Sequence, residues 1–432
     1  MPYLLNLLYC SVLIFLSPWL LYKALTTGKY RRGLWHKLTG RAFRRKGNAP
    51  CIWFHGVSVG EIHLLQHVVA AFRRRHLNWH CVISTTTDTG FAEAEKRFPG
   101  CPVFWWPFDF TWAVKRALRR VRPDVIVLAE GELWPNFLTC AKRQAMRVAV
   151  VNGRMSPRSL ARYQKLSGLA RRVWGKLDLV AAQTADYARN FEALGARTVH
   201  VTGSVKYDGA NGDRNNPRTR QFRELFGVQS NDLILVAGST QDPEERIVLD
   251  IYRRAAAVHP NLRLFLVPRQ QDRFEPVAGL LQRSGLPFVR RSTISGPRTD
   301  SRGIVLVDTI GELGALWGLA DVAFVGGSLD GQRGGQNMIE PAAYGAAVVF
   351  GPHVWNFKEI AGRLLENGAA VQVKNAEELE KEIERLLADA KARDEMGAAG
   401  RDLVHSQQGA TERTLVLLDE LIAPSSGKAK AA

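Results

Sequence analysis

The sequence predicts an α/β protein in which two Rossmann-like domains face one cleft and follow an N-terminal membrane anchor helix. Short β-branched runs alternate with amphipathic segments of helix length, as in a parallel sheet that is covered on both faces. A polar segment rich in turn-forming residues, 208–217 (DGANGDRNNP), interrupts this alternation near the middle of the chain. The length of 432 residues suits two domains, because one domain takes about 150 residues.

From these observations we expect five consecutive parts. They are an anchor at 1–24, an N-terminal domain at 25–207, a linker at 208–230, a C-terminal domain at 231–423 and a disordered tail at 424–432.

Each predicted strand is a short run rich in branched apolar residues. In the N-terminal domain the expected strands are 52–55, 81–85, 103–106, 125–128, 148–151, 179–182 and 199–201, with helices such as 62–74, 111–121 and 159–173 between them. In the C-terminal domain the expected strands are 233–237, 262–267, 304–307, 322–325 and 347–350, with helices such as 244–257, 312–319 and 376–396. A last helical run, 412–421, could pack back on the first domain. Ligands bind beyond the carboxyl ends of strands in such sheets, so the segments that follow strands are the candidate site.

The net charge of +18 is concentrated in the first half of the chain. Up to Lys206 there are 32 Lys and Arg residues against 11 Asp and Glu, and after it there are 27 against 30. A basic half of this kind faces a polyanion, either a nucleic acid or an anionic membrane surface. The five cysteines show neither metal-ligand nor disulfide spacing, which favours reduced thiols in the cytosol.

The N-terminus favours the membrane. The run from Tyr3 to Tyr22 is almost wholly apolar, and about 20 such residues span a bilayer core. Only basic charges follow it as far as Lys46, so the positive-inside rule places the rest of the protein in the cytoplasm. No basic segment precedes the run and no cleavage-site pattern follows it, which argues against a cleaved signal peptide. Because it contains Pro18, the segment could instead lie in the interface as a monotopic anchor.

The stretch 324–341, FVGGSLDGQRGGQNMIEP, indicates a phosphate or nucleotide site. Its five glycines let backbone N–H groups approach an anion, and the helix that opens near Asn337 adds the positive end of its dipole. Glu340, one turn into that helix, could accept hydrogen bonds from ribose hydroxyls. An ordinary glycine-rich turn capped by Asn337 explains the same residues, since no Walker or GxGxxG spacing is present.

The segment 55–61, HGVSVGE, follows the first strand and opens the first long helix. Glu61 is a candidate general base for activating a hydroxyl. Ser58 and Glu61 also match a capping box, so they could serve the helix start alone. The helix dipole would favour the ionised form of Glu61 that a base needs.

Two further strand ends carry carboxylates. Glu130 and Glu132 in LAEGELWPN (128–136) could hold sugar hydroxyls or orient another group. Alternatively, Glu132 caps the helix that opens with Pro135. Asp88 in STTTDTG (84–90) poses the same choice, beside threonines that offer hydroxyls to an anion.

Anion-binding side chains recur after successive strands. These residues are Arg154, Lys206, Ser239, Thr240 and Arg269. An arginine matches a carboxylate or phosphate as a two-pronged donor, and several such positions at strand ends favour an anionic ligand over solvated surface charge. No metal-binding spacing stands out, so we expect chemistry without a metal or cofactor.

Nine motifs occur in an order that closely resembles one family. They are HGVSVGE, STTTDTG, LAEGELWPN, VNGRMS, TGSVKYD, AGST, VPR, GGSLDGQRGGQNMIEPAAYG and FGPHVWNFKEI. The chain resembles the 3-deoxy-D-manno-octulosonic acid (Kdo) transferase family of lipopolysaccharide synthesis, glycosyltransferases of the GT-B fold. Each motif alone is weak, but the ordered set is specific and covers nearly the whole chain.

The resemblance implies an inverting glycosyltransferase that moves Kdo from CMP-Kdo to a lipid A precursor, lipid IVA. It implies work at the cytoplasmic face of the inner membrane of a Gram-negative bacterium, with the anionic membrane surface rather than nucleic acid as the partner of the basic domain. It implies that Glu61 is the general base, deprotonating an acceptor hydroxyl while CMP leaves as an anion.

The resemblance also assigns the two substrates to the two domains. The implied donor-binding residues are Ser239, Thr240, Arg269, Gly326, Gly327, Ser328, Gly334, Gly335, Asn337 and Glu340. The implied acceptor-binding or supporting residues are Ser58, Gly60, Asp88, Glu130, Glu132, Arg154 and Lys206.

Two positions depart from the family. Gln336 and Gln270 stand where the family usually carries histidine. A neutral amide there replaces a titratable donor, which bears on donor affinity and on its pH dependence.

Other functions fit parts of the pattern. A different GT-B transferase or a sugar-nucleotide epimerase would share the fold and use another nucleotide, such as a uridine nucleotide. A membrane-tethered scaffold or a nucleic-acid-binding protein would share the basic charge, but the motifs that read bases are absent.

Overall fold

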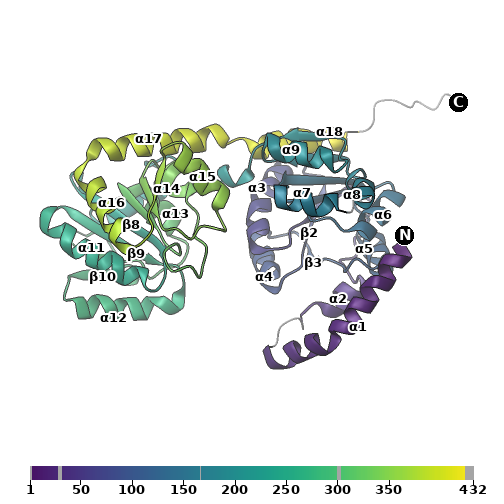
Figure 1. Ribbon diagram of the computed structural model, residues 1–432, viewed down its shortest axis with the longest axis horizontal. Helices are drawn as coiled ribbons and strands as arrows, with labels where there is room; N and C mark the ends of the chain where they lie inside the picture. Colours follow the sequence, from purple (N-terminus) through teal and green to yellow (C-terminus); the bar gives the residue numbers. More distant parts are fainter. Residues whose placement is uncertain (1, 28–31, 166, 299–302, 424–432) are drawn as a thin grey trace. The chain divides into compact units, whose positions relative to one another are not determined.

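The structure, a computed structural model, describes residues 2–27, 32–165, 167–298 and 303–423, and the predicted disordered tail lies outside them. It divides into two compact units, of which unit 1 holds Met1–Gly209 and Gln407–Ala432, and unit 2 holds Ala210–Ser406 (Figure 1). Among the described residues, each unit contains a seven-stranded, parallel sheet. The predicted α/β class with two parallel-sheet domains is therefore confirmed. That the two domains face one cleft stays a prediction.

The sheet of unit 1 has the strand order β3-β2-β1-β4-β5-β6-β7. Its strands are β1 (Cys51–His55), β2 (His80–Thr85), β3 (Val103–Trp105), β4 (Val125–Ala129), β5 (Arg147–Gly153), β6 (Leu179–Ala182) and β7 (Val199–Val201). The helices between them are α3 (Val59–Arg75), α4 (Asp88–Arg97), α5 (Thr111–Val121), α6 (Pro135–Arg143), α7 (Pro157–Gln164), α8 (Ser167–Trp174) and α9 (Ala185–Ala193), and the 3₁₀ turn η1 (Val205–Tyr207) follows β7. The strand order reverses between β1 and β4, and such a switch point opens the crevice in which doubly wound sheets bind ligands.

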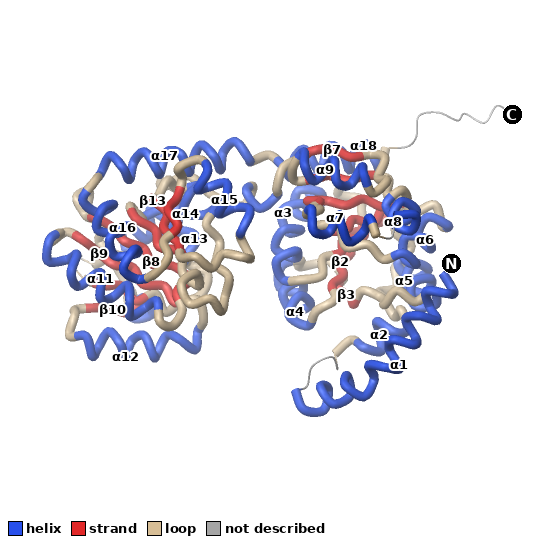
Figure 2. The backbone as a smooth tube through the Cα atoms, in the orientation of Figure 1, coloured by secondary structure: helices blue, strands red, loops and turns tan. Residues whose placement is uncertain are grey.

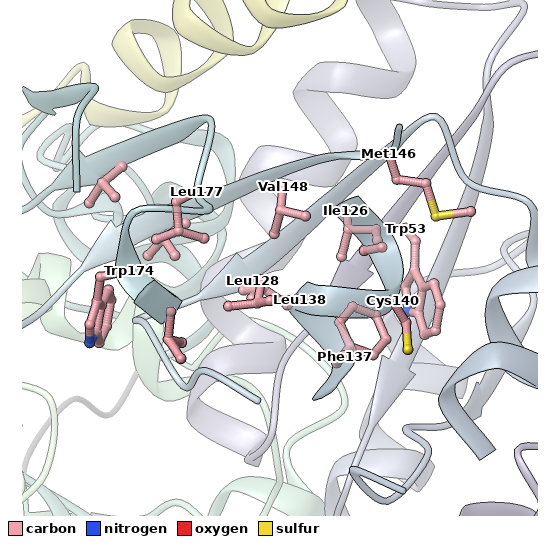
Figure 3. Packing of buried hydrophobic residues seen from close by; sticks show 14 of the residues in the cluster. Trp53, Ile126, Leu128, Phe137, Leu138, Cys140, Met146, Val148, Trp174 and Leu177 are labelled. Atoms are coloured by element: carbon pink, nitrogen blue, oxygen red, sulfur yellow. The ribbon is translucent and has the colours of Figure 1, made fainter. Parts of the chain in front are cut away.

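The middle strands of unit 1 are buried along their whole length, which explains their continuous apolar sequences. Trp53 of β1 and Ile126 of β4 are register partners, and both point to the face of the sheet that α6 covers (Figure 3). There the ring of Trp53 meets Phe137 of α6 edge-on, with 5.4 Å between ring centroids. Ile52 and Phe54 belong to the core on the opposite face, with α3. Because β1 is packed between helices on both faces of the sheet, the loop that follows it starts from a fixed position.

The last helix, α18 (Ala410–Ile422), packs on α3 in unit 1 (Figure 1). The carboxylate of Asp419 accepts hydrogen bonds from Arg75 (2.8 Å) and His76 (2.6 Å) at the end of α3. The expectation that 412–421 packs on the first domain is therefore confirmed. This segment does not belong to the C-terminal domain expected at 231–423.

The sheet of unit 2 has the order β10-β11-β9-β8-β12-β13-β14, and its switch point lies between β8 and β12. Its strands are β8 (Leu233–Thr240), β9 (Leu262–Pro268), β10 (Phe288–Arg290), β11 (Ile304–Leu306), β12 (Val322–Val325), β13 (Ala347–Phe350) and β14 (Ala370–Gln372). Its helices are α10 (Pro217–Leu225), α11 (Glu244–Val258), α12 (Phe274–Ser284), α13 (Leu313–Leu316), α14 (Ile339–Ala343), α15 (Lys358–Glu366), α16 (Ala376–Ala388) and α17 (Ala390–Gln407), with the 3₁₀ turns η2 (Gln271–Arg273), η3 (Arg291–Thr293) and η4 (Trp317–Leu319). In Figure 2 the strands, in red, run between the helices, in blue.

Part of the expected linker is a helix of unit 2. The side chain of Asn216 accepts hydrogen bonds from the N–H groups of Arg218 and Thr219 and so caps α10. Phe226, just after the helix, packs edge-on against Phe265 of β9, with 5.1 Å between ring centroids. The linker prediction of 208–230 is wrong for 217–225, because apolar residues there are buried on the sheet.

Helix α1 (Pro2–Thr27) forms over the expected anchor, and α2 (Leu34–Thr39) follows it. Within the described part of the chain, no helix combines the length and the apolar character that crossing a membrane requires, so the transmembrane form of the predicted anchor is not supported. Near its start, α1 is joined to unit 1 by polar contacts. The side chain of Asn6 is buried and donates to Thr111 Oγ1 (2.7 Å), and Tyr9 donates to Asp109 (3.2 Å).

Candidate active site

The loop between β1 and α3 holds the candidate base at the switch point of unit 1. Ser58 caps α3, because its hydroxyl accepts the Glu61 N–H (3.4 Å). In return, Glu61 Oε2 accepts the Val57 N–H (2.7 Å), and Glu61 Oε1 accepts the Ser58 hydroxyl (3.3 Å). The Val57 carbonyl in turn accepts hydrogen bonds from the hydroxyls of Thr85 and Thr87. The predicted capping arrangement is therefore present, and it fixes the half-buried carboxyl of Glu61 in one place.

Burial raises the pKa of Glu61 to about 7. The Val57 N–H opposes this rise by stabilising the charged form, and the negative charges of Glu130 and Glu132 add to it. The Val57 N–H before the helix thus favours the ionised form, but the loss of water around the carboxyl outweighs this effect. A carboxyl that titrates near neutral pH can accept a proton from a substrate and release it again.

Glu130, directly after β4, lies close enough to Glu61 for its charge to act on the pKa of that carboxyl. Its φ of 56° lies in the left-handed region, which few residues other than glycine adopt. Its carboxylate lies 3.3 Å from Lys206 Nζ and accepts a hydrogen bond from Asn152 Nδ2 (3.4 Å). Strained backbone of this kind clusters at functional sites, which supports a role for the ends of β4 and β5.

Asn152, at the end of β5, was not predicted. It is fully buried, has a φ of 52°, and its Oδ1 accepts the Val205 N–H (3.0 Å). It thus joins Glu130 to the turn η1 that carries Lys206. An Asn before Gly153 at a strand end was the available signal, because Asn tolerates the left-handed conformation.

The other predicted residues of unit 1 lie around this centre. Arg154 donates its backbone N–H to the Glu130 carbonyl (3.0 Å), and its side chain is exposed, as is Glu132. Asp88 begins α4, and its charge partly offsets the burial that lowers the pKa of Lys37. Gly60 is exposed, and a Cβ there would have Ser58 Oγ at 3.8 Å, so the fold itself does not require this glycine.

Asp109 caps α6, the helix that opens after Glu132. Its two carboxylate oxygens accept the N–H groups of Asn136 (3.0 Å) and Phe137 (2.8 Å). Burial raises the pKa of Asp109 to about 6, and the two N–H groups oppose that rise. The suggestion that Glu132 caps this helix is therefore wrong. Sequence reasoning missed Asp109 because the contact joins residues far apart in the chain.

In unit 2 the glycine loop follows β12, as predicted. Gly327, Gly334 and Gly335 have φ angles of 65°, 79° and 80°, which only glycine adopts freely. The Gly335 N–H donates to the Gly327 carbonyl (2.8 Å) and closes the loop. Gln336, the departure from the family, lies beside Gly327, since a Cβ on that glycine would meet Gln336 Nε2 at 3.2 Å.

The first N–H groups of this loop have a partner inside the protein. Those of Gly327 (2.7 Å) and Ser328 (2.9 Å) donate to the carboxylate of Glu244, a fully buried residue of α11. Gly326 makes room for this contact, because a Cβ there would meet Glu244 Oε2 and Thr240 Cα, both at 2.7 Å. The sequence had suggested that these two N–H groups face a phosphate, but both donate to Glu244 instead.

Asn337 and Glu340 lie in the second half of the loop. Asn337 Oδ1 accepts the Ile339 N–H (3.1 Å), and Asn337 Nδ2 donates to Glu340 Oε1 (2.9 Å). The N-cap of α14 is Met338, whose side chain makes no capping hydrogen bond, so Asn337 forms a turn just before the helix and the predicted capping role is wrong. Burial raises the pKa of Glu340, and the Asn337 amide and the charge of Arg269 lower it. Glu340 and the exposed Arg269 therefore lie close enough to interact.

The end of β8 meets the start of the glycine loop. Ser239 has a left-handed φ of 57°, and the Thr240 carbonyl accepts the Arg269 N–H (3.0 Å). The Thr240 hydroxyl is buried and finds no hydrogen-bond partner among the described residues. The fold thus brings together, at the carboxyl ends of neighbouring strands, Ser239, Thr240, Arg269 and Gly326. No group of three or more His, Cys, Asp or Glu residues in the described ranges is placed to hold a metal ion, and metal-independent chemistry stays a prediction.

Comparison with known proteins gives consistent relatives. A sequence model described as 3-Deoxy-D-manno-octulosonic-acid transferase (kdotransferase) matches residues 30–209. A 3-deoxy-D-manno-octulosonic acid transferase of Haemophilus influenzae is 33% identical over 95% of this chain and 97% of its own length. One of Bordetella pertussis is 35% identical over 90% of this chain and 92% of its own.

Among solved structures, UDP-GlcNAc 2-epimerase from Neisseria meningitidis superposes with a TM-score of 0.56. It covers 86% of this chain and 100% of its own, at 11% identity. At that identity the likeness shows the fold alone.

Proposed function

The chain belongs to the Kdo transferase family of glycosyltransferases, which act in lipopolysaccharide synthesis, and we propose that it moves Kdo from CMP-Kdo to a lipid A precursor, lipid IVA. The observation that carries this proposal is the carboxyl of Glu61. It lies at the switch point of unit 1, is held by Val57 and Ser58, and titrates near neutral pH. A residue with a perturbed pKa at such a point suits proton transfer.

In the proposed reaction, Glu61 removes the proton from an acceptor hydroxyl as the oxygen attacks the anomeric carbon of Kdo. A new C–O bond forms on the face opposite the phosphate, so the configuration inverts. The bond between the anomeric carbon and the phosphate oxygen breaks, and CMP leaves with the electron pair. Lys206, beside Glu130, supports binding of the acceptor's phosphates.

We assign the donor to unit 2. The buried Thr240 hydroxyl and the exposed Arg269 at the end of β8 and β9 support phosphate and carboxylate binding there. Glu340, oriented by Asn337, supports binding of the ribose hydroxyls. Gly334 and Gly335 shape this part of the loop, because a Cβ at Gly334 would collide with the ring of Trp355 and one at Gly335 would lie against Val354.

We further propose that α1 holds the protein on the cytoplasmic face of the inner membrane by lying in the interface. Asn6 and Tyr9 join α1 to unit 1, whereas Leu4, Leu7 and Phe15 expose between 65% and 85% of their surface. Exposed apolar side chains next to a basic domain favour binding to an anionic bilayer, because the apolar groups insert in the interface and the basic residues attract the lipid charges. Vesicles that contain anionic lipid should therefore sediment the protein, and Leu7→Ser with Phe15→Ser should weaken this by about tenfold or more. Unchanged binding by that variant would contradict the role of α1.

Two experiments test the proposed function. Incubation with CMP-Kdo and a tetra-acylated lipid A precursor, followed by mass spectrometry, should show an added Kdo mass and would also count the sugars. Thermal unfolding should show stabilisation by CMP but not by UDP, because a ligand that binds only the native state raises its stability. Stabilisation by UDP alone would instead support the alternative, a GT-B transferase or epimerase that uses another sugar nucleotide.

A further inference from the structure

Glu244 of unit 2 has a buried carboxylate that backbone N–H groups surround. It is fully buried, at the first turn of α11, and accepts four backbone N–H groups. Oε2 accepts those of Gln241 (3.0 Å) and Gly327 (2.7 Å), and Oε1 accepts those of Ser328 (2.9 Å) and Leu329 (3.0 Å). The described residues provide no ion pair for it. Burial raises the pKa of the Glu244 carboxyl, and the four N–H groups oppose that rise by stabilising the charged form. A carboxylate in this setting occupies the position that a bound anion takes in a glycine-rich loop.

The contacts of Glu244 extend through the glycine loop. Gly327 donates its N–H to Glu244, and its carbonyl accepts the N–H of Gly335. Ser328 donates its N–H to Glu244, and its carbonyl accepts the His353 N–H (2.9 Å) from the loop after β13. Three strand ends, those of β8, β12 and β13, are thus joined around one buried carboxylate.

We propose that Glu244 is the positioning residue of the donor site. It fills the first anion-binding turn of the glycine loop with a charge of the protein's own, and it thereby directs the donor's phosphate to the second half of the loop, at Gln336 and Asn337. This inference rests on the proposed function of unit 2 as the donor domain. The negative charge of Glu244 repels a second anion from the N–H groups of 327–329, and the hydrogen bond between Gly327 and Gly335 sets the conformation of the half that remains open.

The test compares two neighbouring glutamates. Glu244→Gln keeps the size of the side chain but turns an NH₂ group towards two N–H donors, so one side of the turn is released. The control is Glu245→Gln, which affects an equally buried glutamate that pairs with Arg273 (3.2 Å) and touches no part of the glycine loop in the hydrogen bonds of the described residues. Both variants should unfold at a lower temperature than the wild type.

Only Glu244→Gln should raise the dissociation constant of CMP and the KM for the sugar donor, by about tenfold or more, since small displacements of a binding group carry such costs. The KM for the acceptor should change little. Equal CMP affinity in the two variants, measured where both are folded, would overturn the proposal.

Hydrogen exchange of the wild-type protein gives a second test that does not depend on the stability of a variant. Without ligand, the amides of Gly327, Ser328, Leu329 and Gly335 should already be protected, and CMP should add protection at Gln336 and Asn337. Rapid exchange of the first three, or protection that CMP adds mainly to them, would overturn the proposal. Failure of the wild type to bind CMP would contradict the proposed donor, whereas exchange in the free protein would still report on Glu244.

Discussion

The backbone N–H of Val57 donates to Glu61 Oε2 over 2.7 Å, so the loop that precedes α3 holds the carboxyl that we assign as the base. The capping and the catalytic interpretations of Glu61 are therefore compatible. The contact orients the carboxyl, and Oε1, whose contact with the Ser58 hydroxyl is longer at 3.3 Å, is the oxygen better placed to take a proton from an acceptor.

The raised pKa of Glu61 predicts how the rate depends on pH. Because the pKa is about 7, the active, ionised form declines as the pH falls through 7, and kcat/KM should fall with it. Measuring kcat/KM between pH 5 and pH 9 checks this. A rate that stays constant down to pH 5 would show that the group titrates near its ordinary value.

The same pKa predicts an effect on stability. The folded state binds the proton of Glu61 more tightly than the unfolded state does, so the contribution of Glu61 to stability falls as the pH rises from about 4.5 to 7. Glu61→Gln removes this pH-dependent contribution to stability. The unfolding midpoint of Glu61→Gln should therefore rise relative to that of the wild type as the pH increases from 5 to 8. A constant difference between the two midpoints would contradict the raised pKa.

Glu130 should influence the pKa of Glu61. Its negative charge raises the pKa of Glu61, so Glu130→Gln should move the acidic limb of the rate profile to lower pH, by less than about one pH unit. Lys206→Met gives the matched control, because it leaves Glu130 without its cation and should move the limb to higher pH. Shifts in the same direction in both variants would exclude an electrostatic origin.

Asp109 should matter to stability rather than to proton transfer. In Asp109→Asn an NH₂ group would face the N–H of Asn136 or Phe137 at the start of α6. We expect a loss of about 1 to 2 kcal/mol in the free energy of unfolding, the usual cost of a lost helix cap. Denaturation by urea measures this. Tyr9→Phe, which removes one hydrogen bond to the same carboxylate, should cost less.

The sequence predicted most strands because their apolar runs are continuous, as in β1 and β4, which are buried on both faces. It missed β10 (Phe288–Arg290) and β14 (Ala370–Gln372), which are three residues long and lie at the edges of their sheet. It also merged α16 with α17, since charged helix-forming residues continue across Asp389, which separates them.

Local motifs likewise predicted Glu61, Glu130 and the glycine loop as candidate site residues, because glycines and polar residues after strands are visible in the sequence. They did not identify Glu244 or Asp109. Each of these carboxylates acts on backbone N–H groups that a different strand brings to it, so its role depends on the order of strands in the sheet rather than on its neighbours in the chain.

The central claim is that Glu61 takes the proton of the acceptor hydroxyl. The most direct measurement is single-turnover transfer from CMP-Kdo to a tetra-acylated lipid A precursor by Glu61→Gln, alongside its affinity for CMP. The amide keeps the size of the side chain and cannot act as the base, so transfer should slow by about 100-fold or more while CMP binding is retained. Transfer at a rate close to that of the wild type would contradict the assignment of Glu61 as the base.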